Sequence, residues 1–293
     1  MSSLPSVRGK LTQDYPLGKD SWFRCGGSAD LLFEPADFDD LDDFLKNYDD
    51  DVLVLGGLAN TIVRDGGIRG CVIRLGKAFA EIKIDGNRIT AGAGALNGSV
   101  ASAASKNGIG GLEFLSGIPG TLGGALRMNA GAYGAEVKDV LVKAETIDSA
   151  GSVRQLSPDQ MGMTYRHTAV PQDQIFTQGV LEGAIEETDI VRARLKEIKA
   201  KRQATQPISE QTGGSTFANP KGMKAWELID QAGCRDLKIG GACLSEKHCN
   251  FMINAGGATA SDLENLGDEI IRIVAEKTGA ILRWEIKRIG DRL

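Results

Sequence analysis

The 293-residue sequence has few of the residues from which metal sites and disulfide frameworks are built. It contains only two histidines, His167 and His248, and its five cysteines form no C-x-x-C pair. Because a structural zinc site needs clustered Cys and His ligands, we expect no metal centre. The odd number of cysteines favours reduced thiols, as found in the cytoplasm, over a disulfide framework.

Long hydrophobic runs are also missing. No stretch approaches the roughly 18 apolar residues of a membrane-spanning helix, and the N-terminal residues MSSLPSVRGKLTQDYPLG lack the apolar core of a secretory signal. The formal net charge is −5, so the chain as a whole does not attract nucleic acid or an anionic membrane. The sequence therefore predicts a cytoplasmic protein that holds any anionic ligand with local Arg, Lys or backbone N–H groups.

Glycine, in contrast, is concentrated in residues 108–134, where nine of 27 positions are Gly. Apolar residues such as Leu112 and Leu126 are interleaved with the glycines, and the only charged residues are Glu113 and Arg127. A flexible linker lacks such apolar anchors. Because a fixed Gly is entropically unfavourable, a dense run indicates positive φ angles or a ligand lying against the backbone. We interpret the run as a cradle of N–H donors for a phosphate-bearing cofactor, with tight turns in a buried sheet as the alternative.

Two further Gly-rich segments lie next to strand-like sequences. Residues 56–67 (GGLANTIVRDGG) match neither G-x-G-x-x-G nor a Walker A loop, and residues 91–98 (AGAGALNG) have Asn97 where a third Gly is needed. Neither segment alone supports a Rossmann domain. Together with residues 108–134 they predict one extended pyrophosphate site built from backbone donors.

The hydrophobic pattern predicts a mixture of helices and strands. In residues 36–50, Phe38, Leu41, Leu45 and Tyr48 recur at helical spacing, and the Asp residues lie on the opposite, solvated face. Other predicted elements of the N-terminal part are a helix at 96–108, a hairpin at 142–156, a buried strand at 52–57, and strands at 71–75, 79–84, 88–93 and 175–185.

The composition changes in the C-terminal part. A basic helix is predicted for 188–205, a loop for 206–222 and a closing strand for 281–290. Ser261 and Glu264 have the spacing of a capping box at the start of one more helix. We therefore place a domain boundary near residues 186–190, before a compact α+β unit.

Three polar residues have a functional interpretation beside an ordinary one. Ser215 lies in GGSTF, which is not the G-x-S-x-G of a nucleophile elbow, and a loop or cap hydroxyl is the ordinary interpretation. Arg166, between Tyr and His, has the pattern of a surface arginine. Glu285 lies in the apolar segment ILRWEIKRI, where it either points at a site or forms the polar side of an edge strand. The residues alone leave these alternatives open.

Several long segments, in order along nearly the whole chain, resemble the UDP-N-acetylenolpyruvoylglucosamine reductase (MurB) family. FLSGIPGTLGGALRMNAGAYG (114–134) resembles the family's longest signature, and LGGLANTIVRDGGIRGCVI (55–73) resembles its first flavin loop. The other matching segments are FRCGGSADLLFEP (23–35), YRHTAVP (165–171), RQATQPISEQTGGSTFANP (202–220) and WEIKRIG (284–290). Several long motifs in the right order are more specific than a single short match.

The chain departs from the family pattern at a few positions. Ala59 stands where a Ser usually precedes Asn60. The resemblance therefore implies that one hydroxyl contact to the cofactor phosphate is missing while the backbone donors remain. Cys25 replaces an aliphatic residue, and Ala218 replaces a Lys that often precedes the Asn of the serine loop. None of these changes removes a catalytic residue. The short distance between residues 166 and 202 resembles the shorter, type II form of the family.

The resemblance implies an α+β fold with two domains. Residues 1–188 are expected to form an FAD-binding domain of the vanillyl-alcohol-oxidase (PCMH) type, with two subdomains and a core of about 21–186. Residues 189–293 are expected to form an α+β substrate-binding domain.

The resemblance also implies an activity, that of an FAD-dependent oxidoreductase (UDP-N-acetylmuramate dehydrogenase). NADPH reduces the FAD, and hydride then passes to the enolpyruvyl double bond of UDP-N-acetylglucosamine-enolpyruvate to give UDP-N-acetylmuramate. This product is a precursor of peptidoglycan, which links the protein to cell wall biogenesis, cell shape and cell division. The expected partner is the UDP-sugar, without nucleic acid or membrane, and a monomer is favoured.

The resemblance assigns roles to individual residues. Ser215 is expected to donate the proton to the carbon beside the carboxylate, and Arg166 and Glu285 to stabilise the enol-type intermediate. This suits the residue types, because an Arg fork matches a carboxylate and a protonated Glu can donate a hydrogen bond to the same oxygens. The resemblance also implies that the substrate contacts are Tyr165, Arg202, Asn219 and His248. The expected FAD contacts are Gly56, Gly57, Leu58, Ala59, Asn60, Thr61, Ser116, Gly117, Ile118, Pro119, Gly120, Thr121, Gly123, Gly124, Asn129, Ala130 and Gly131.

Two other functions stay open at this point. The first is an FAD oxidase of the same fold that uses dioxygen, in which Cys25 or Cys71 would be available for covalent flavin attachment. The second is a non-catalytic protein that binds a nucleotide sugar. It predicts loss of the three catalytic residues, and all three are present in the sequence.

Overall fold

The computed structural model of the chain describes residues 4–293, which form two compact units. Unit 1 comprises residues 4–12, 32–57 and 70–201, and unit 2 comprises residues 13–31, 58–69 and 202–293. Each unit is thus assembled from three separate stretches of chain. The boundary after residue 201 lies inside α5 (Thr188–Thr205), a helix with the predicted bounds. The domain ranges 1–188 and 189–293 remain predictions from the sequence.

The first sheet of unit 1 is covered by a helix that the sequence pattern predicts. Its elements are β1 (Lys10–Tyr15), β2 (Ala29–Glu34), α2 (Phe38–Asn47), β3 (Val52–Leu55) and β5 (Ile68–Arg74). The strand order is β1-β2-β5-β3, and β3 runs parallel to β5 with Val52 opposite Cys71. Phe44 of α2 stacks on Phe33 of β2, with ring centroids 4.2 Å apart. The helix predicted within 36–50 is confirmed.

One carboxylate of α2 does not lie on the solvated face. Asp40 is 3% exposed and accepts hydrogen bonds of 2.7–2.8 Å from the backbone N–H groups of Arg8, Gly9 and Ala36. The prediction of a fully solvated acidic face is wrong here, because backbone donors beside the helix need an acceptor. Burial alone would raise the pKa of Asp40, but these donors lower it overall.

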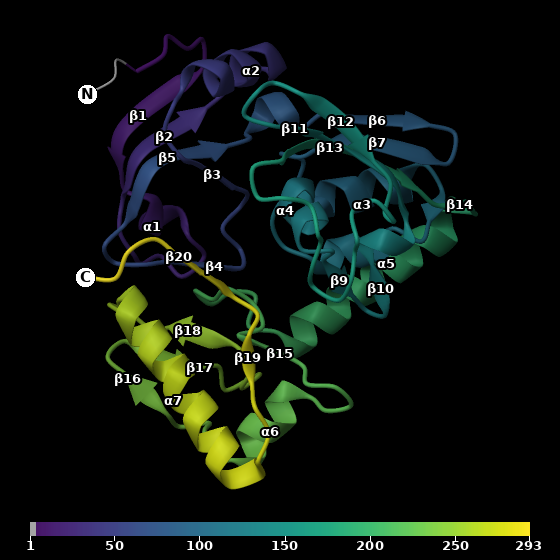
Figure 1. Cartoon of the computed structure of the whole chain (residues 1–293). Helices are drawn as coiled ribbons and strands as arrows, with labels where there is room; N and C mark the ends of the chain where they lie inside the picture. Colours follow the sequence, from purple (N-terminus) through teal and green to yellow (C-terminus); the bar gives the residue numbers. More distant parts are fainter. Residues whose placement is uncertain (1–3) are drawn as a thin grey trace. The chain divides into compact units, whose positions relative to one another are not determined.

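The second sheet of unit 1 is antiparallel and is covered by two short helices (Figure 1). Its elements are β6 (Ile82–Asp85), β7 (Arg88–Gly92), α3 (Asn97–Lys106), α4 (Leu122–Arg127), β11 (Leu141–Ile147), β12 (Val153–Leu156) and β13 (Ile175–Glu182). The strand order is β12-β11-β13-β7-β6. Leu122 and Leu126 of α4 lie against Gly179 of β13. The predicted hairpin is confirmed by the pairing of Ile147 with Val153.

Shorter elements complete unit 1 and surround the Gly-rich run. They are η1 (Lys77–Phe79), β8 (Ile109–Gly110), η2 (Glu113–Gly117), β9 (Gly131–Ala132), β10 (Ala135–Glu136), η3 (Val137–Asp139) and β14 (Ala184–Ile185). Arg194 of α5 pairs with Glu113 at 2.8 Å and with Glu186 at 2.7 Å. These ion pairs attach α5 to the start of the run.

Unit 2 combines residues from all three of its chain stretches in one core. Phe23, Ile62 and Phe217 are buried there with the apolar face of α7. Its elements are α1 (Leu17–Asp20), β4 (Thr61–Val63), β15 (Phe217–Ala218), α6 (Ala225–Gln231), β16 (Lys238–Ile239), β17 (Ala242–Leu244), β18 (Met252–Asn254), α7 (Ala260–Thr278), β19 (Arg283–Trp284) and β20 (Lys287–Ile289). Its sheets have the orders β16-β17-β18, β15-β19 and β20-β4.

The capping box of α7 lies two residues earlier than predicted. Thr259 Oγ1 accepts a hydrogen bond from Asp262 N, and Asp262 Oδ2 accepts one from Thr259 N, both at 3.0 Å. Thr259–Asp262 and Ser261–Glu264 have the same spacing, so the pattern alone could not separate them. Glu264 is 3% exposed and accepts hydrogen bonds of 3.0–3.2 Å from Arg64. The prediction of Ser261 and Glu264 as the box is therefore wrong.

The closing strand predicted for 281–290 is divided in two. β19 pairs antiparallel with β15, and β20 pairs parallel with β4. Glu285 and Ile286 lie between the two pairings, where the strand changes its partner. Glu285 is therefore at a break between two short ladders rather than in a continuous edge strand.

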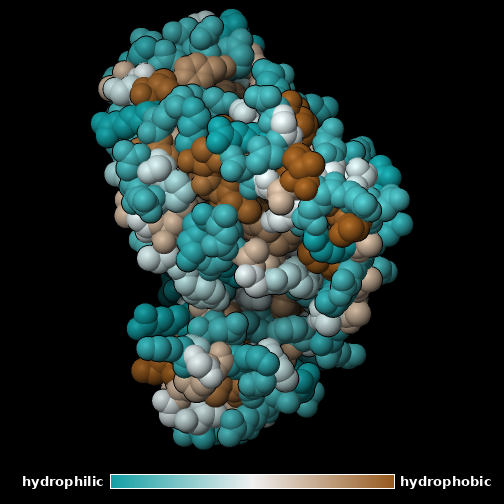
Figure 2. Space-filling view, turned by 90° about the vertical axis from the view of Figure 1, so that its right-hand side faces the viewer, coloured by the Kyte–Doolittle hydropathy of each residue, from teal (hydrophilic) through white to brown (hydrophobic). Residues whose placement is uncertain are grey.

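The surface in Figure 2 is mainly hydrophilic on the face shown, and its apolar residues form separate groups. Within residues 4–293, no helix is both long and apolar enough to cross a membrane. The five cysteines are free thiols and are buried or half-buried.

Candidate active site

Two Gly-rich loops of unit 1 are packed closely against each other. A Cβ on Gly56, just after β3, would lie 2.7 Å from Oγ1 of Thr121, and one on Gly57 would lie 3.2 Å from Cα of Gly120. Gly120 also has a φ of +89°, in the region that favours glycine. Side chains at these positions would fill the space between the loops. The glycines therefore maintain the close approach that the sequence predicts for a cofactor cradle.

The third Gly-rich segment, residues 91–98, supports this cradle through backbone hydrogen bonds. Ala93 O and Ala95 O accept hydrogen bonds of 2.8 Å from the N–H groups of Gly123 and Leu122, and Asn97 N donates to Gly120 O at 3.1 Å. These groups are engaged within the protein. The segments therefore adjoin within unit 1, and the prediction of one pyrophosphate site built from the backbone donors of all three loops stays a prediction.

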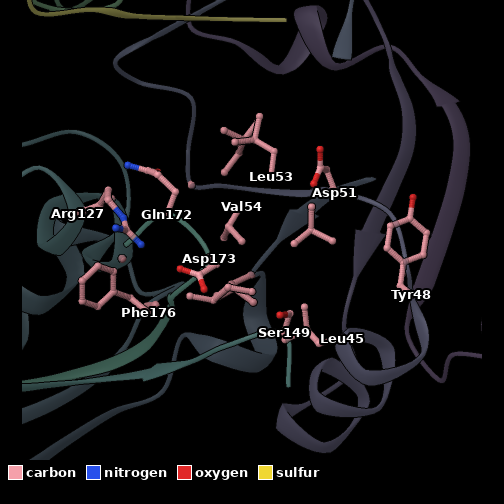
Figure 3. A pocket seen from close by; sticks show the side chains of 18 of the residues that line it. Leu45, Tyr48, Asp51, Leu53, Val54, Arg127, Ser149, Gln172, Asp173 and Phe176 are labelled. Carbon is pink, nitrogen blue, oxygen red and sulfur yellow. The ribbon is translucent and has the colours of Figure 1, made fainter. Parts of the chain in front are cut away.

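A cavity of about 780 Å³ in unit 1 opens beside the cradle (Figure 3). Gly56, Thr121, Gly123 and Gly124 of the cradle line one part of it. Its other lining residues include Leu45, Tyr48, Asp51, Leu53, Val54, Arg127, Ser149, Gln172, Asp173 and Phe176. The volume is in the range of ligand and cofactor pockets, about 300–1,000 Å³.

Strand β3 forms an apolar wall of this cavity. Its sequence VLVL predicts a buried strand, but all four residues are only half-buried. The prediction of full burial is wrong because the cavity lies along the strand. A half-exposed run of β-branched and Leu side chains beside a cradle suits the apolar part of a cofactor.

Residues 116–131 continue from the cradle towards the Tyr165–Arg166 turn. Ser116 Oγ donates to Glu113 O at 2.7 Å, and a Cβ on Gly117 would lie 2.5 Å from the Tyr133 ring. The Asn129 side chain is fully buried and makes three hydrogen bonds: its Nδ2 donates to Glu136 Oε2 and Thr164 O, and its Oδ1 accepts from Lys138 N. Its main-chain N–H also donates, to Leu126 O at 3.2 Å, so both the side chain and the backbone N–H of Asn129 hold the run in place.

Arg166 lies at the tip of a tight turn in unit 1. The backbones of Thr164 and His167 pair at 2.9 and 3.1 Å, which leaves Tyr165 and Arg166 at the tip. Arg166 has a φ of +55°, a strained value for a side-chain-bearing residue. Its Nη2 donates to Gly131 O at 2.9 Å, and its guanidinium lies 4.8 Å from the Tyr165 ring centroid. The turn thus joins two predicted site residues to the end of the Gly-rich run.

In unit 2, backbone pairing brings the serine loop, the flavin loop and Glu285 together. Glu285 N donates to Thr216 O at 2.8 Å, directly beside Ser215. Asn60 Nδ2 donates to Glu285 O at 3.2 Å, and Lys287 N donates to Asn60 O at 3.0 Å. Residues 285–287 therefore lie between Asn60 and the serine loop. Sequence reasoning placed these residues in one site, and within unit 2 they do adjoin.

Glu285 is half-buried between two residues that are packed in unit 2. Trp284 and Ile286, its two neighbours, both pack on the core of that unit. Trp284 is fixed by a hydrogen bond of 3.0 Å to Asp268 and by the Arg288 guanidinium 4.5 Å from its ring centroid. These contacts hold the backbone that carries Glu285.

The flavin-loop residues 58–61 lead into β4 in unit 2, which begins at Thr61. Leu58 has a φ of +51°, and Leu58 and Ala59 are buried. Thr61 is paired with Lys287 in the parallel ladder. Gly214, next to Ser215, has a φ of +84° and open space on the side where a Cβ would be, since the nearest atom is Ala59 O at 4.0 Å. This glycine lets the serine loop turn beside the flavin loop.

The predicted substrate residues of unit 2 have structural partners. Arg202 Nε donates to Gln206 Oε1 at 3.2 Å, and Asn219 Oδ1 accepts from Ala225 N at 2.9 Å. His248 packs edge-on against Phe251 at 4.8 Å and Trp226 at 6.4 Å. Burial lowers the pKa of His248, so its ring is neutral at pH 7. The ring offers a ligand an aromatic surface and a hydrogen bond rather than a charge.

The predicted residues thus fall on both units. Unit 1 holds Gly56, Gly57, residues 116–131, Tyr165 and Arg166, and unit 2 holds residues 58–61, Arg202, Ser215, Asn219, His248 and Glu285. Sequence reasoning missed the cavity beyond the cradle, including Leu53, Val54, Gln172 and Phe176. It noted Arg127 as one of two charges in the Gly-rich run but assigned it no role. Among residues 4–293 no cluster of His, Cys, Asp or Glu is suited to a metal ion.

Comparisons with known proteins agree with this arrangement. A family model described as the FAD binding domain matches residues 29–157, and one described as the C-terminal domain of UDP-N-acetylenolpyruvoylglucosamine reductase matches residues 206–289. The reductase of Rhodospirillum rubrum is 53% identical over 98% of this chain and 92% of its own. That of Paramagnetospirillum magneticum is 53% identical over 99% of this chain and 95% of its own.

A solved structure has the same fold over nearly the full length. The UDP-N-acetylenolpyruvylglucosamine reductase (MurB) of Thermus caldophilus matches with a TM-score of 0.84 and 30% identity, over 97% of this chain and all of that one. The predicted fold class, an α+β FAD-binding domain of the vanillyl-alcohol-oxidase type with an α+β substrate domain, is confirmed. The chain belongs to the UDP-N-acetylenolpyruvoylglucosamine reductase family.

Proposed function

We propose that this chain uses NADPH and FAD to reduce UDP-N-acetylglucosamine-enolpyruvate to UDP-N-acetylmuramate for peptidoglycan synthesis. The observation that carries the proposal is the junction in unit 2, where Glu285 is hydrogen-bonded at 2.8 Å to Thr216, the neighbour of Ser215, and at 3.2 Å to the flavin-loop residue Asn60. A proton donor and a carboxyl group beside a flavin loop suit hydride addition to a double bond that bears a carboxylate.

The residues of unit 1 fit FAD. The cradle around Gly56, Gly57 and Gly120 has no room for side chains and presents main-chain groups, which suits a diphosphate. The adjoining cavity of about 780 Å³ offers an apolar wall for an adenosine. Bound FAD supplies a hydride carrier between NADPH and the enolpyruvyl carbon. We assign the cofactor contacts to residues 56–61, 116–121, 123–124 and 129–131, with the cavity residues Leu53, Val54 and Phe176 added.

Three side chains are proposed to act on the substrate. Ser215 donates a proton to the carbon beside the carboxylate. Because a serine hydroxyl is a weak acid, its effect depends on being held in place, and the 2.8 Å backbone bond beside it restricts its loop. Arg166 and Glu285 stabilise the negative charge that develops on the carboxylate oxygens, Arg166 by its planar fork and Glu285 by a hydrogen bond from its protonated form.

The roles of the two domains are proposed in the same way. We propose residues 1–188 as the FAD-binding domain and residues 189–293 as the substrate-binding domain, with Tyr165, Arg202, Asn219 and His248 as substrate contacts. We also propose that the protein works as a monomer in the cytoplasm, without nucleic acid or a membrane as a partner.

An oxidase with covalently bound flavin is less well supported. Cys71 is 1% exposed, and Cys25 is half-buried beside the unit 2 core. Burial raises the pKa of both thiols to about 12, so the reactive thiolate is scarce at neutral pH. A non-catalytic binding protein is disfavoured because Arg166, Ser215 and Glu285 are all retained.

The test is purification followed by a visible spectrum and a product assay. We expect a yellow protein, or one that turns yellow with added FAD, whose flavin is released by denaturation. With NADPH and the enolpyruvyl UDP-sugar it should form UDP-N-acetylmuramate. A protein that takes up no FAD would contradict the proposal, and so would a flavoprotein that consumes dioxygen rather than the UDP-sugar.

A further inference from the structure

Arg127, the last residue of α4, brings a half-buried positive charge to the wall of the cavity in unit 1. Its Nη1 donates to Val170 O at 2.7 Å and to Pro171 O at 3.0 Å, and its Nη2 donates to Gln174 O. The guanidinium lies 4.8 Å from the ring centroid of Phe176. These carbonyls and the ring fix its position without neutralising its charge.

This charge has no carboxylate partner in the part of the chain that the structure describes. No ion pair within 4.0 Å joins Arg127 to a residue of 4–293. Burial lowers the pKa of Arg127, and Asp173 opposes this effect only from a distance. A guanidinium has five N–H donors, of which three are used here. A bound anion would relieve the burial of this charge and could use the donors that remain.

Arg127 lies on the same face of α4 as two glycines of the cradle. Gly123 and Gly124 are four and three positions before it, so they lie one helical turn earlier, on the face that the Arg127 side chain covers. All three residues line the cavity. A Cβ on Gly124 would meet only Thr121 Oγ1, at 4.0 Å, so a ligand can approach the backbone there and the guanidinium together, whereas the missing side chain of Gly123 makes room for Ala93.

One other charge of the cavity, the carboxylate of Asp173, lies on the Arg127 side of the view in Figure 3, and it partly offsets the effect of burial on the pKa of Arg127. Lys46 is paired with Asp42 at 2.6 Å. Asp49, Asp50 and Asp51 follow Tyr48, and Figure 3 shows Tyr48 and Arg127 at opposite ends of the view. The Arg127 end thus has one guanidinium and one carboxylate, whereas the other end has three carboxylates, so an anionic group is better placed at the Arg127 end, beside the glycines.

We propose that Arg127 is the side chain that binds the diphosphate of FAD in this chain. The inference rests on the proposed function, in which the nucleotide half of FAD occupies this cavity. The flavin loop carries Ala59 where a hydroxyl is expected, so the charge of Arg127 supplies binding energy that the loop side chain does not. Arg127 would select for the diphosphate and have little effect on the adenosine.

The test compares ADP and adenosine as probes on the full-length, flavin-free chain. Calorimetric titration gives their dissociation constants for wild type, Arg127→Gln and Arg127→Lys. We expect Arg127→Gln to weaken the binding of ADP about tenfold to a hundredfold, the range for a hydrogen bond to a charged group. The binding of adenosine should weaken by less than about threefold. Arg127→Lys, which retains the charge, should keep most of the preference for ADP. The matched control is Lys46→Gln, a cavity cation that is already paired, and it should leave both constants nearly unchanged.

Equal weakening of ADP and adenosine by Arg127→Gln would overturn the inference, because it would mean that Arg127 only shapes the 170–174 loop. So would an unchanged ADP affinity. If Arg127→Gln does not fold, the test uses the wild-type chain. Added salt should weaken its binding of ADP and not its binding of adenosine, and an equal effect on both would overturn the inference. A wild-type chain that binds neither ADP nor FAD would instead contradict the proposed function.

Discussion

Asn60 of the flavin loop donates a hydrogen bond from Nδ2 to the main-chain oxygen of Glu285, at 3.2 Å. Lys287 N returns a hydrogen bond to Asn60 O at 3.0 Å. The loop that is assigned to the cofactor and the segment that carries a proposed catalytic carboxyl group are thus joined directly. The geometry of Glu285 depends on this loop, although the two residues are 225 positions apart.

Replacing Asn60 by Ala should remove this connection. We expect a loss of about 1 kcal/mol of stability for one part-buried hydrogen bond and slower reduction of the UDP-sugar, because Glu285 is held less firmly. Flavin reduction by NADPH should change less. Asn60→Asp is the matched control for size, and since it cannot donate to Glu285 O it should behave like Asn60→Ala. Normal reduction of the UDP-sugar in both variants would contradict the positioning role.

Ser215→Ala should separate the two half-reactions. Flavin reduction by NADPH needs no proton from Ser215 and should proceed at nearly the wild-type rate. Reduction of the enolpyruvyl group should slow by about 10²- to 10⁴-fold, the usual contribution of a positioned proton donor. Stopped-flow absorbance of the flavin measures both steps. Ser215→Cys retains a proton on the side chain and should recover part of the rate, whereas equal slowing of both steps would show that the role is misassigned.

Gly267→Ala should destabilise unit 2, although Ala favours a helix over Gly by up to about 1 kcal/mol. A Cβ at this position would lie 2.2 Å from the Trp284 ring, which is held by Asp268 and Arg288. We expect a net loss of about 1–3 kcal/mol, as for overpacked cores. Urea unfolding measures it.

The control is Gly98→Ala, in α3 of unit 1, where a Cβ would meet nothing within 4 Å. This change should be neutral or slightly stabilising. An effect of the same sign and size in both variants would show that the contact between position 267 and the Trp284 ring does not determine the loss of stability.

Asp40→Asn should make the chain less stable at neutral pH. The three backbone donors lower the pKa of Asp40, so its contribution is present above the unfolded value, about 3.9, and is lost as the pH falls through the folded value. We expect Asn to cost about 1–3 kcal/mol at pH 7 and the difference from wild type to shrink towards pH 3. Exposed Asp39→Asn is the control and should stay within about 0.5 kcal/mol at both pH values.

Periodicity and Gly patterns predicted the elements whose determinants are local. The helices at 38–47 and 188–205 and the hairpin at 141–156 follow from apolar spacing and turn residues. The capping box of α7 was missed because Thr259 and Ser261 begin identical patterns, and the choice depends on the contact of Glu264 with Arg64. The burial of Asp40 was missed because it also depends on distant contacts: its partners include residues 31 and 32 positions away in the sequence.

The candidate site was predictable to the extent that it is made of motifs. The serine loop, the flavin loop and WEIKRIG were expected to act together, and the pairings of β15 with β19 and of β4 with β20 bring them together in unit 2. The cavity was not predictable, because VLVL is the same sequence whether a strand faces a core or a ligand. The pairing of Asn60 with Glu285 depends on a change of strand partner that no local pattern encodes.

The central claim is tested most directly by following the flavin without dioxygen. One equivalent of NADPH should bleach the absorbance of the protein, and the enolpyruvyl UDP-sugar should then restore it with formation of one equivalent of UDP-N-acetylmuramate. A flavin that bleaches but regains its colour only when dioxygen is admitted would contradict the account.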